Sequence, residues 1–404
     1  MVRRRKSPAA LATLCLLAAG CTGGSGGQAA PTTGSPAVRS PIASTAAPVP
    51  SQPAKARPPA TSAVAARPAV RAPESPGLVW MATPLPAKVV AAATGLRPAA
   101  DVVPVANGTV WLPARTGVLE TPIDVSAADP RRYAAAVPSA SALARLVPGQ
   151  VILSADSARL RGLRVGDRTS PGGISLTVVG IVADRLIGYA EMFVTAQDGR
   201  RLSLPAARFL LVRPRRAAAW PAMARTVRGS ADGRAIRVEA PGKAVRLREA
   251  DAVLSPLEEK LRFGEFTADP HVSSAGDIEI DPAWLSAHIV TADVPILGAV
   301  TCNRAFLPAL RSALTEVVKE GLQGLIRPGD YGGCFNARLI AGQAGHSISH
   351  HTYGSAIDLN VSTNPQGIVG TPNVRLVKAF AKYGLTWGGS WLAPDGMHFE
   401  ALGR

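Results

Sequence analysis

The chain has 404 residues, a length that suggests about two or three domains. Hydrophobic residues make up 47% of it but aromatic residues only 5%, and Gly (39) and Pro (35) are frequent. This mixture excludes both a uniformly folded chain and a wholly disordered one. The formal net charge is +16, which suits an anionic partner such as nucleic acid, anionic lipid or an acidic wall polymer.

Residues 1–20 have the pattern of a signal peptide. A short basic run, Arg3 to Lys6, precedes a mostly apolar stretch, Ala9 to Gly20, which is too short for a spanning helix of ~20 residues. Small residues before Cys21 resemble a bacterial lipobox, in which this cysteine is lipidated; ordinary secretion is the alternative. We therefore expect an extracytoplasmic bacterial protein, held at the membrane by a lipid anchor or secreted.

Composition then changes twice along the chain. Residues 21–77 are rich in Pro, Ala, Ser and Thr and lack apolar periodicity, so we expect a disordered tether. Residues 78–253 are predicted to form a β-rich module, with strands at Val151–Leu153, Leu176–Val182 and Phe209–Val212. A short helix is predicted over Ala155–Arg161, ended by Gly162.

The stretch from Ser154 to Val182 resembles the extracytoplasmic domain of MacB/FtsX-type permeases. The resemblance implies a borrowed extracellular module without the permease's transmembrane helices. It also suggests an envelope protein as a partner of residues 78–253. No residue cluster in this module has a catalytic pattern.

Residues 254–404 have the composition of a globular α+β domain. Apolar residues from Leu307 to Val318 recur at three- and four-residue spacing, which predicts a helix. A second helix is expected to open at Thr371-Pro372 and to end at Gly384. Strands are expected at Ile278–Ile280 and Ala356–Asn360.

Histidines gather near the C-terminus, at His346, His350, His351 and His398. His351 and Asp358 lie in one run, and His398 lies in a second, strand-like run. Two imidazoles and a carboxylate, with a fourth position left open, are the ligand set of a catalytic zinc site. His351 and Asp358 could meet if a loop containing Gly354 folds back into a strand.

The pattern Ser-x-His-x-x-Gly-x-Ala-x-Asp followed by Asp-x-x-His resembles the M15 zinc peptidases, the family of D-Ala-D-Ala carboxypeptidases and L-alanoyl-D-glutamate peptidases. The resemblance implies that zinc is bound by three residues, His351, Asp358 and His398. It further implies that Asp395 is the general base and that Arg338 polarises the substrate carbonyl or anchors its carboxylate.

Some neighbouring residues have two interpretations. His350 adjoins the ligand position, but the spacing to Gly354 and Asp358 favours His351. Glu400 either orients His398 through its second ring nitrogen or lies on the surface. Cys302 and Cys334 are the cysteines other than Cys15 and Cys21; export favours a disulfide between them, with free core thiols as the alternative.

These features predict an exported zinc metallopeptidase of the cell wall, acting on peptidoglycan stem peptides as a carboxypeptidase or an endopeptidase. The alternative is a non-catalytic wall-binding lipoprotein with a vestigial metal site. Serine peptidase and thermolysin-like motifs are absent from the sequence. Nucleic-acid binding is not expected, because the positive charge is spread along the chain and the protein is predicted to be exported.

Overall fold

A computed structural model describes residues 73–114, 118–247, 254–273, 276–340 and 347–402. All of them belong to one structural unit, residues 67–404. The predicted signal peptide, Cys21 and most of the tether lie outside the described residues. Helices and strands are both abundant among the described residues, which confirms the predicted α+β class.

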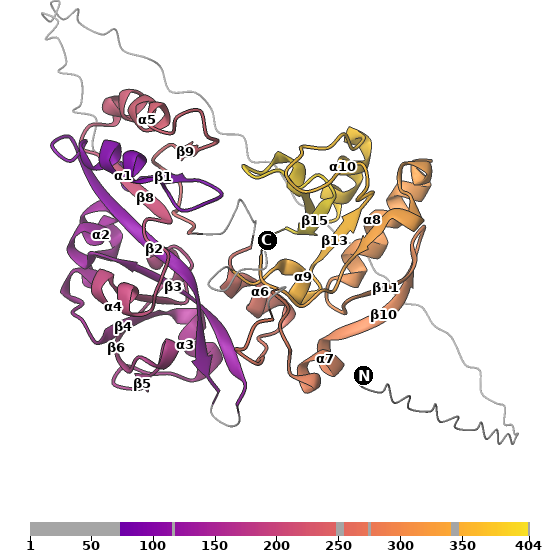
Figure 1. The fold of residues 1–404 in the computed structure, drawn as a ribbon, viewed down its shortest axis with the longest axis horizontal. Helices are drawn as coiled ribbons and strands as arrows, with labels where there is room; N and C mark the ends of the chain where they lie inside the picture. Colours follow the sequence, from indigo (N-terminus) through magenta and orange to yellow (C-terminus); the bar gives the residue numbers. More distant parts are fainter. Residues whose placement is uncertain (1–72, 115–117, 248–253, 274–275, 341–346, 403–404) are drawn as a thin grey trace, which may run out of the picture. The chain divides into compact units, whose positions relative to one another are not determined.

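Residues 77–239 build a nine-stranded mixed sheet in the order β5-β6-β4-β7-β3-β2-β8-β1-β9 (Figure 1). The pairs β3–β7 and β4–β6 are parallel, and the other pairs are antiparallel. The strands of this sheet are β1 Gly77–Trp80, β2 Ala100–Pro113, β3 Glu120–Ala128, β4 Gln150–Ser154, β5 Arg168–Thr169, β6 Leu176–Val182, β7 Met192–Thr195, β8 Phe209–Pro214 and β9 Arg237–Glu239. The accompanying helices are α1 Ala87–Thr94, α2 Pro130–Ala136, α3 Ala155–Arg161, α4 Ala196–Arg201 and α5 Trp220–Gly229.

The predicted elements of this region agree with the structure. Helix α3 spans the expected residues, because the Ser154 hydroxyl caps its first turn and Gly162 ends it in a left-handed conformation (φ 64°). The three predicted strands are β4, β6 and β8.

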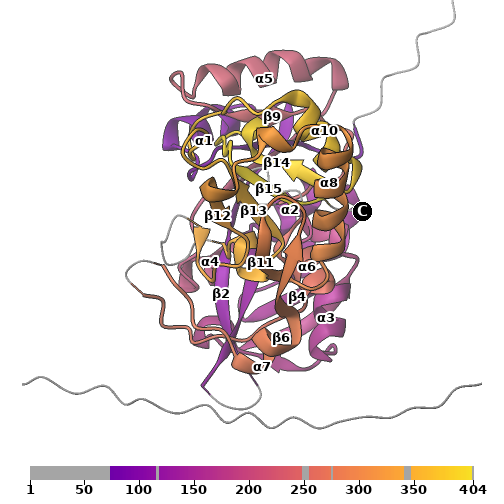
Figure 2. The ribbon, with the colours of Figure 1, turned by 90° about the vertical axis from the view of Figure 1, so that its right-hand side faces the viewer.

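Residues 256–401 build two smaller sheets, β10-β11 and β12-β13-β15-β14. Figures 1 and 2 show the four-stranded sheet from two sides, with α8 and α10 next to each other. The elements in chain order are α6 Pro256–Phe263, α7 Pro282–His288, β10 Ile289–Val294, β11 Gly298–Asn303, α8 Leu307–Lys319, β12 Tyr331–Gly333, α9 His350–Tyr353, β13 Ala356–Leu359, α10 Val374–Lys382, β14 Leu385–Trp387 and β15 His398–Ala401.

One core joins these elements. Leu310 of α8, Ile357 of β13, Phe380 of α10 and Phe399 of β15 are completely or almost completely buried in a single apolar cluster. The predicted helix from Leu307 is confirmed as α8, whose buried face carries the expected apolar residues except Val318, which is 47% exposed. This packing fixes the β13–β15 pair, which carries two of the predicted metal ligands.

Two predicted elements differ from the structure. Helix α10 starts at Val374 and not at Thr371-Pro372, because the side chain of Asn373 accepts a hydrogen bond from the Arg375 amide and so caps the helix. The segment Ile278–Ile280 is not a continuous strand. It forms only isolated bridges, because Ile280 pairs with Ala268 while the adjacent Asp277 pairs with Arg338.

Candidate metal centre

A short helix and two paired strands bring the three predicted ligands together. His351 lies on α9, whose first turn is capped by the Ser349 hydroxyl. Gly354 ends this helix in a left-handed conformation (φ 63°), and the chain turns directly into β13, which carries Asp358. Asp358 and His398 are direct partners in the antiparallel β13–β15 register. The predicted fold-back at Gly354 is thus present.

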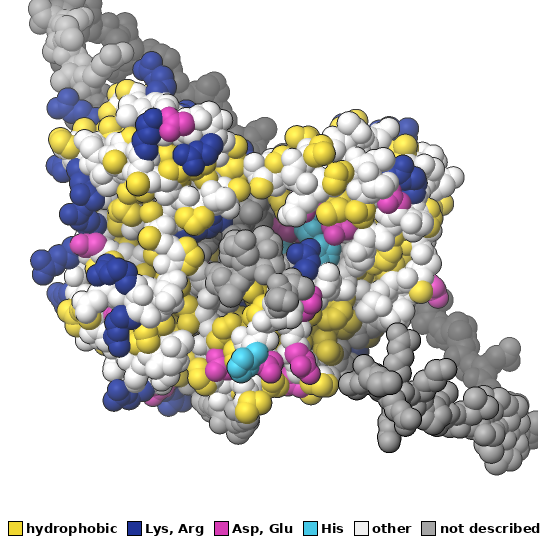
Figure 3. Space-filling model, in the orientation of Figure 1, with side chains coloured by type: hydrophobic (Ala, Val, Ile, Leu, Met, Phe, Trp, Pro, Cys, Tyr) yellow, Lys and Arg dark blue, Asp and Glu magenta, His cyan; other side chains and the backbone are white. Residues whose placement is uncertain are grey.

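The side chains of His351, Asp358 and His398 converge on one point. His351 Nε2 lies 3.1 Å from His398 Nδ1 and 3.2 Å from Asp358 Oδ2. His398 Nδ1 lies 3.1 Å from Asp358 Oδ1. All three residues are buried, and each offers one ligand atom within 4.8 Å of the others. Figure 3 shows histidine side chains on one face of the molecule, next to acidic and basic side chains.

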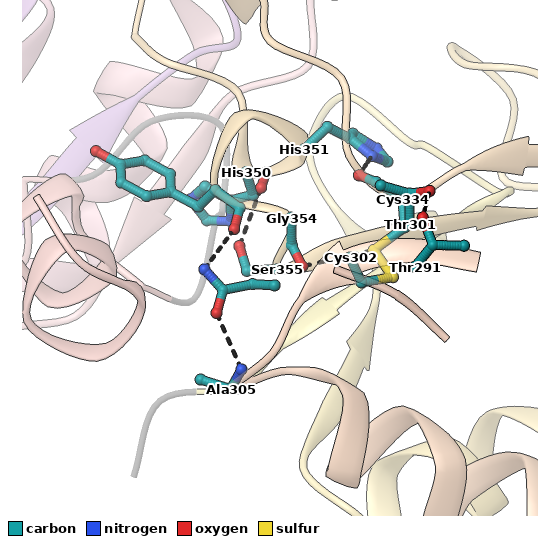
Figure 4. The surroundings of a disulfide bond; sticks show 11 residues. Thr291, Thr301, Cys302, Ala305, Cys334, His350, His351, Gly354 and Ser355 are labelled. Atoms are coloured by element: carbon teal, nitrogen blue, oxygen red, sulfur yellow. Dashed lines mark hydrogen bonds between the residues drawn. A yellow bond between two sulfur atoms is a disulfide. The ribbon is translucent and has the colours of Figure 1, made fainter. Parts of the chain in front are cut away.

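The second nitrogen of each histidine faces an oxygen. His351 Nδ1 lies 2.8 Å from the carbonyl oxygen of Cys334, as Figure 4 shows. His398 Nε2 lies 3.3 Å from Glu400 Oε2, and Glu400 is only 1% exposed. Such contacts fix the tautomer in which the other nitrogen is free to bind a metal. Of the two interpretations of Glu400, the geometry supports the one in which it faces His398.

A disulfide between Cys302 and Cys334 holds the segment whose backbone faces His351. It joins β11 to the segment after β12, with a Cα–Cα distance of 5.4 Å. The same Cys334 supplies the carbonyl oxygen that faces His351 (Figure 4). The expected disulfide therefore fixes a backbone atom that contacts a candidate ligand.

The charges of the cluster suit a cation. Burial opposes ionisation of Asp358, but hydrogen bonds with His351 and His398 outweigh burial and hold the pKa of this carboxyl far below its ordinary value. Burial likewise lowers the pKa of His398, yet Asp358 and Glu400 raise it to about 10. A metal would therefore have to displace a proton from His398, and its affinity would fall as the pH falls.

Asp395 lies at the edge of the cluster, three residues before His398. It is 8% exposed, and its Oδ1 has no hydrogen-bond partner within the part of the chain that the structure describes. Burial raises the pKa of Asp395, and the charges of His398, His351 and Arg338 partly oppose this. Arg338 is half-buried, and its backbone bonds to the Thr352 side chain.

The structure also shows a buried acidic group that the sequence analysis did not single out. Glu259 of α6 is fully buried, accepts a hydrogen bond of 2.8 Å from the Ser355 hydroxyl and lies 3.5 Å from His350 Nδ1. His350 is therefore part of the layer behind the ligands. A capping pattern, Ser255 followed by Glu258, could have revealed helix α6, but nothing in the sequence shows where Glu259 points.

Histidine and tryptophan side chains outside the three-residue cluster contact their own neighbours. His271 is exposed and pairs with Asp269, and His288 stacks on Trp284. The ring of Trp391 lies 5.1 Å from that of His398, whereas Trp387 donates a hydrogen bond to the carbonyl of Gly396. His346 lies outside the described residues.

The donor set fits zinc. Two neutral imidazole nitrogens and a carboxylate oxygen are three of the four ligands of catalytic zinc sites, in which the last position stays open. In both histidines the ring nitrogen that points away from the cluster faces an oxygen atom, and zinc sites use such contacts to orient their ligands.

Comparison with known protein families finds a match for the C-terminal part of the chain. Residues 342–401 match the family model Peptidase_M15_4, described as D-alanyl-D-alanine carboxypeptidase, which confirms the resemblance of the C-terminal region to M15 peptidases. His351, Asp358, Asp395 and His398 all lie within this match. A search of curated proteins finds no match.

Similar solved structures include the extracellular domain of the noncanonic ABC-type transporter YknZ from Gram-positive bacteria. This match has 13% sequence identity and a TM-score of 0.29, and it covers 40% of this chain and 97% of that chain. Another is the periplasmic region of MacB from Actinobacillus actinomycetemcomitans, with 8% identity, 42% and 90% coverage, and a TM-score of 0.30. A domain of a putative permease protein from Porphyromonas gingivalis has 16% identity, 40% and 82% coverage, and a TM-score of 0.25.

All three are domains of transporters or permeases, the class of protein that residues 154–182 resemble. Among the described residues, no helix is long and apolar enough to cross a membrane. The domain boundaries at 77/78 and 253/254, the lipid anchor and an envelope partner stay predictions.

Proposed function

We propose that the chain is an exported zinc peptidase that hydrolyses peptide bonds in peptidoglycan stem peptides. The observation that carries the proposal is the convergence of His351, Asp358 and His398 within the residues that match the M15 family model. Carboxypeptidase cleavage at D-Ala-D-Ala and endopeptidase cleavage after L-Ala need the same ligand set, so both are retained.

In this proposal the three ligands hold the ion, and the contacts with the Cys334 carbonyl and Glu400 keep both imidazoles in the binding tautomer. Zinc in such a site supplies Lewis acidity, which makes water nucleophilic at neutral pH and polarises a peptide carbonyl. The remaining chemistry belongs to side chains around the ligands.

Asp395 is proposed as the general base. Its buried carboxylate has an oxygen without a partner among the described residues, which leaves it able to accept a proton from the attacking water. Water adds to the carbonyl carbon, Asp395 takes its proton, and the same proton passes to the leaving amine as the C–N bond breaks. Arg338 stabilises the negative charge that develops on the carbonyl oxygen, or anchors a substrate carboxylate.

The test is mass spectrometry of muropeptides incubated with the purified protein, with and without a chelator. Chelator-sensitive loss of a terminal D-Ala would identify a zinc carboxypeptidase, and separation after L-Ala an endopeptidase. A His398→Ala variant serves as the matched control for contaminating peptidases. Zinc binding without any product would contradict the proposed substrate, and the absence of both would favour a non-catalytic wall-binding protein.

A further inference from the structure

A chain of buried ionisable side chains lies behind the candidate ligands. His350 Nδ1 is 2.6 Å from Glu400 Oε2 and 3.5 Å from Glu259 Oε1. The same Glu400 oxygen lies 3.3 Å from His398 Nε2. Contacts therefore run without a break from Glu259 on α6, through His350 and Glu400, to a candidate ligand.

The order of the side chains explains why each member is needed. Glu400 is buried, and a buried carboxyl group is costly unless a polar partner faces it. His350 Nδ1 is that partner, and the same nitrogen lies between the carboxyl groups of Glu400 and Glu259.

Glu259 is fixed from its own side as well. Its Oε2 accepts a hydrogen bond from the Ser355 hydroxyl, whose oxygen also lies 3.0 Å from the His350 carbonyl oxygen, so one residue just before β13 contacts both partners. Helix α6 is held in turn by the next residue, Lys260. Its ammonium bonds to Glu191 Oε1 at 2.6 Å and to the carbonyl oxygen of Pro122.

We infer that Glu259 is a positioning residue for the metal ligand His398, acting through His350 and Glu400. The inference rests on the proposed metal site, but Glu259 lies outside residues 342–401, which match the peptidase family model. Loss of one of its carboxyl oxygens would remove the contact that His350 makes on the α6 side. His350 and Glu400 would then shift together, and the hydrogen bond that orients His398 would weaken.

The experiment measures zinc affinity of the full chain by competition with a chelating dye, with Zn²⁺ alone and no substrate. Glu259→Gln keeps the shape of the side chain and replaces one carboxyl oxygen by an amide NH₂ group, which cannot accept a hydrogen bond. We expect it to weaken zinc binding by about tenfold, the lower end of the range for groups that orient metal ligands. Glu316→Gln is the matched control, because Glu316 pairs with Lys382 on the α8–α10 surface, away from these contacts; its zinc affinity should equal that of the wild type.

A merely structural role is distinguished by a double-mutant cycle. If Glu259 acts through Glu400, the loss in Glu259→Gln/Glu400→Gln should be clearly smaller than the product of the two single losses. Wild-type affinity in Glu259→Gln, or independent losses in the cycle, would overturn the inference alone. A wild type that binds no zinc would overturn the metal site as well. If Glu259→Gln does not fold, Ser355→Ala takes its place, and unchanged zinc affinity in that variant overturns the inference.

Discussion

His351 and His398 carry the site at the scale of single residues. Each offers one ring nitrogen to the cluster and has the other facing an oxygen, so neither can be replaced without losing a candidate ligand. We expect His351→Ala and His398→Ala to abolish both zinc retention and peptide hydrolysis. Metal content after dialysis, measured on folded protein, checks this. Stoichiometric zinc in either variant would exclude that histidine as a ligand.

Asp395 has a different expected signature. Because it is proposed to move a proton and not to hold the metal, Asp395→Asn should retain zinc and lose about 10²–10⁴-fold in rate, as is usual for a missing general base. Steady-state kinetics and metal analysis of the same preparation separate the two effects. An unchanged rate would remove Asp395 from the mechanism, and lost zinc would make it a ligand.

At the scale of elements, the turn from α9 into β13 depends on Gly354. Its φ is +63°, and a Cβ atom there would lie 2.6 Å from the backbone nitrogen of Asn303. Gly354→Ala therefore combines an unfavourable backbone conformation, costing about 1–2 kcal/mol, with a contact that only a backbone shift can relieve. We expect a lower free energy of unfolding and weaker zinc binding, since His351 and Asp358 flank the turn.

Gly384 provides the matched control for that variant. It also has a positive φ (+77°), but nothing lies within 4 Å of a Cβ built there. Gly384→Ala should show the backbone cost alone and keep its zinc affinity. Denaturant unfolding and dye competition on both variants give the comparison. Equal losses of stability, with zinc affinity intact in both, would mean that the approach to Asn303 does not matter.

Local patterns explain how much of these elements the sequence could predict. The apolar spacing of α8, and the left-handed glycine between His351 and Asp358, are properties of neighbouring residues, so the helix and the turn could be anticipated. The predicted start of α10 was wrong by a few residues, because Asn373 caps the helix in place of Thr371. Boundaries depend on such small differences in capping energy.

Contacts between distant segments could not be predicted in the same way. Glu259 precedes its partner Ser355 by 96 positions, and no periodicity or motif links the two. Glu400 left two interpretations open for the same reason, because its burial follows from tertiary packing on β15. The convergence of His351, Asp358 and His398 could be predicted because their residue types and spacing are specific, whereas the layer of side chains behind them follows only from the fold.

At the scale of the whole molecule, helix α6 contacts both the nine-stranded sheet region and the candidate metal centre. Its Lys260 pairs with Glu191, which also pairs with Arg161, and Arg161 reaches Glu265. The side chains of Lys260 and Glu191 are at most 1% exposed. Removing one partner of a buried pair leaves an uncompensated charge, which costs about 3–5 kcal/mol. We expect that loss of stability in Glu191→Gln near neutral pH.

The same pair predicts how this cost changes with pH. Burial raises the pKa of Glu191, but Lys260 and Arg161 outweigh burial and hold it below the ordinary value of 4.5. A carboxyl with a depressed folded-state pKa stabilises the fold above its unfolded-state pKa and loses that contribution as the pH falls through the folded-state value. The difference in unfolding free energy between wild type and Glu191→Gln should therefore have its full size above pH 4.5 and become smaller as the pH falls below that value.

Denaturant titrations of both proteins across this range measure the difference, and Lys260→Met provides the control. With the ammonium removed, Glu191 loses one of the two charges that lower its pKa, so Glu191→Gln should cost less in that background. A difference that stays constant into the acid range would show that Glu191 is not ionised in the folded protein. If Glu191→Gln costs the same unfolding free energy with and without Lys260, the stabilisation of Glu191 comes from Arg161 alone. The Lys260–Glu191 pair would then not hold α6 beside the candidate metal centre.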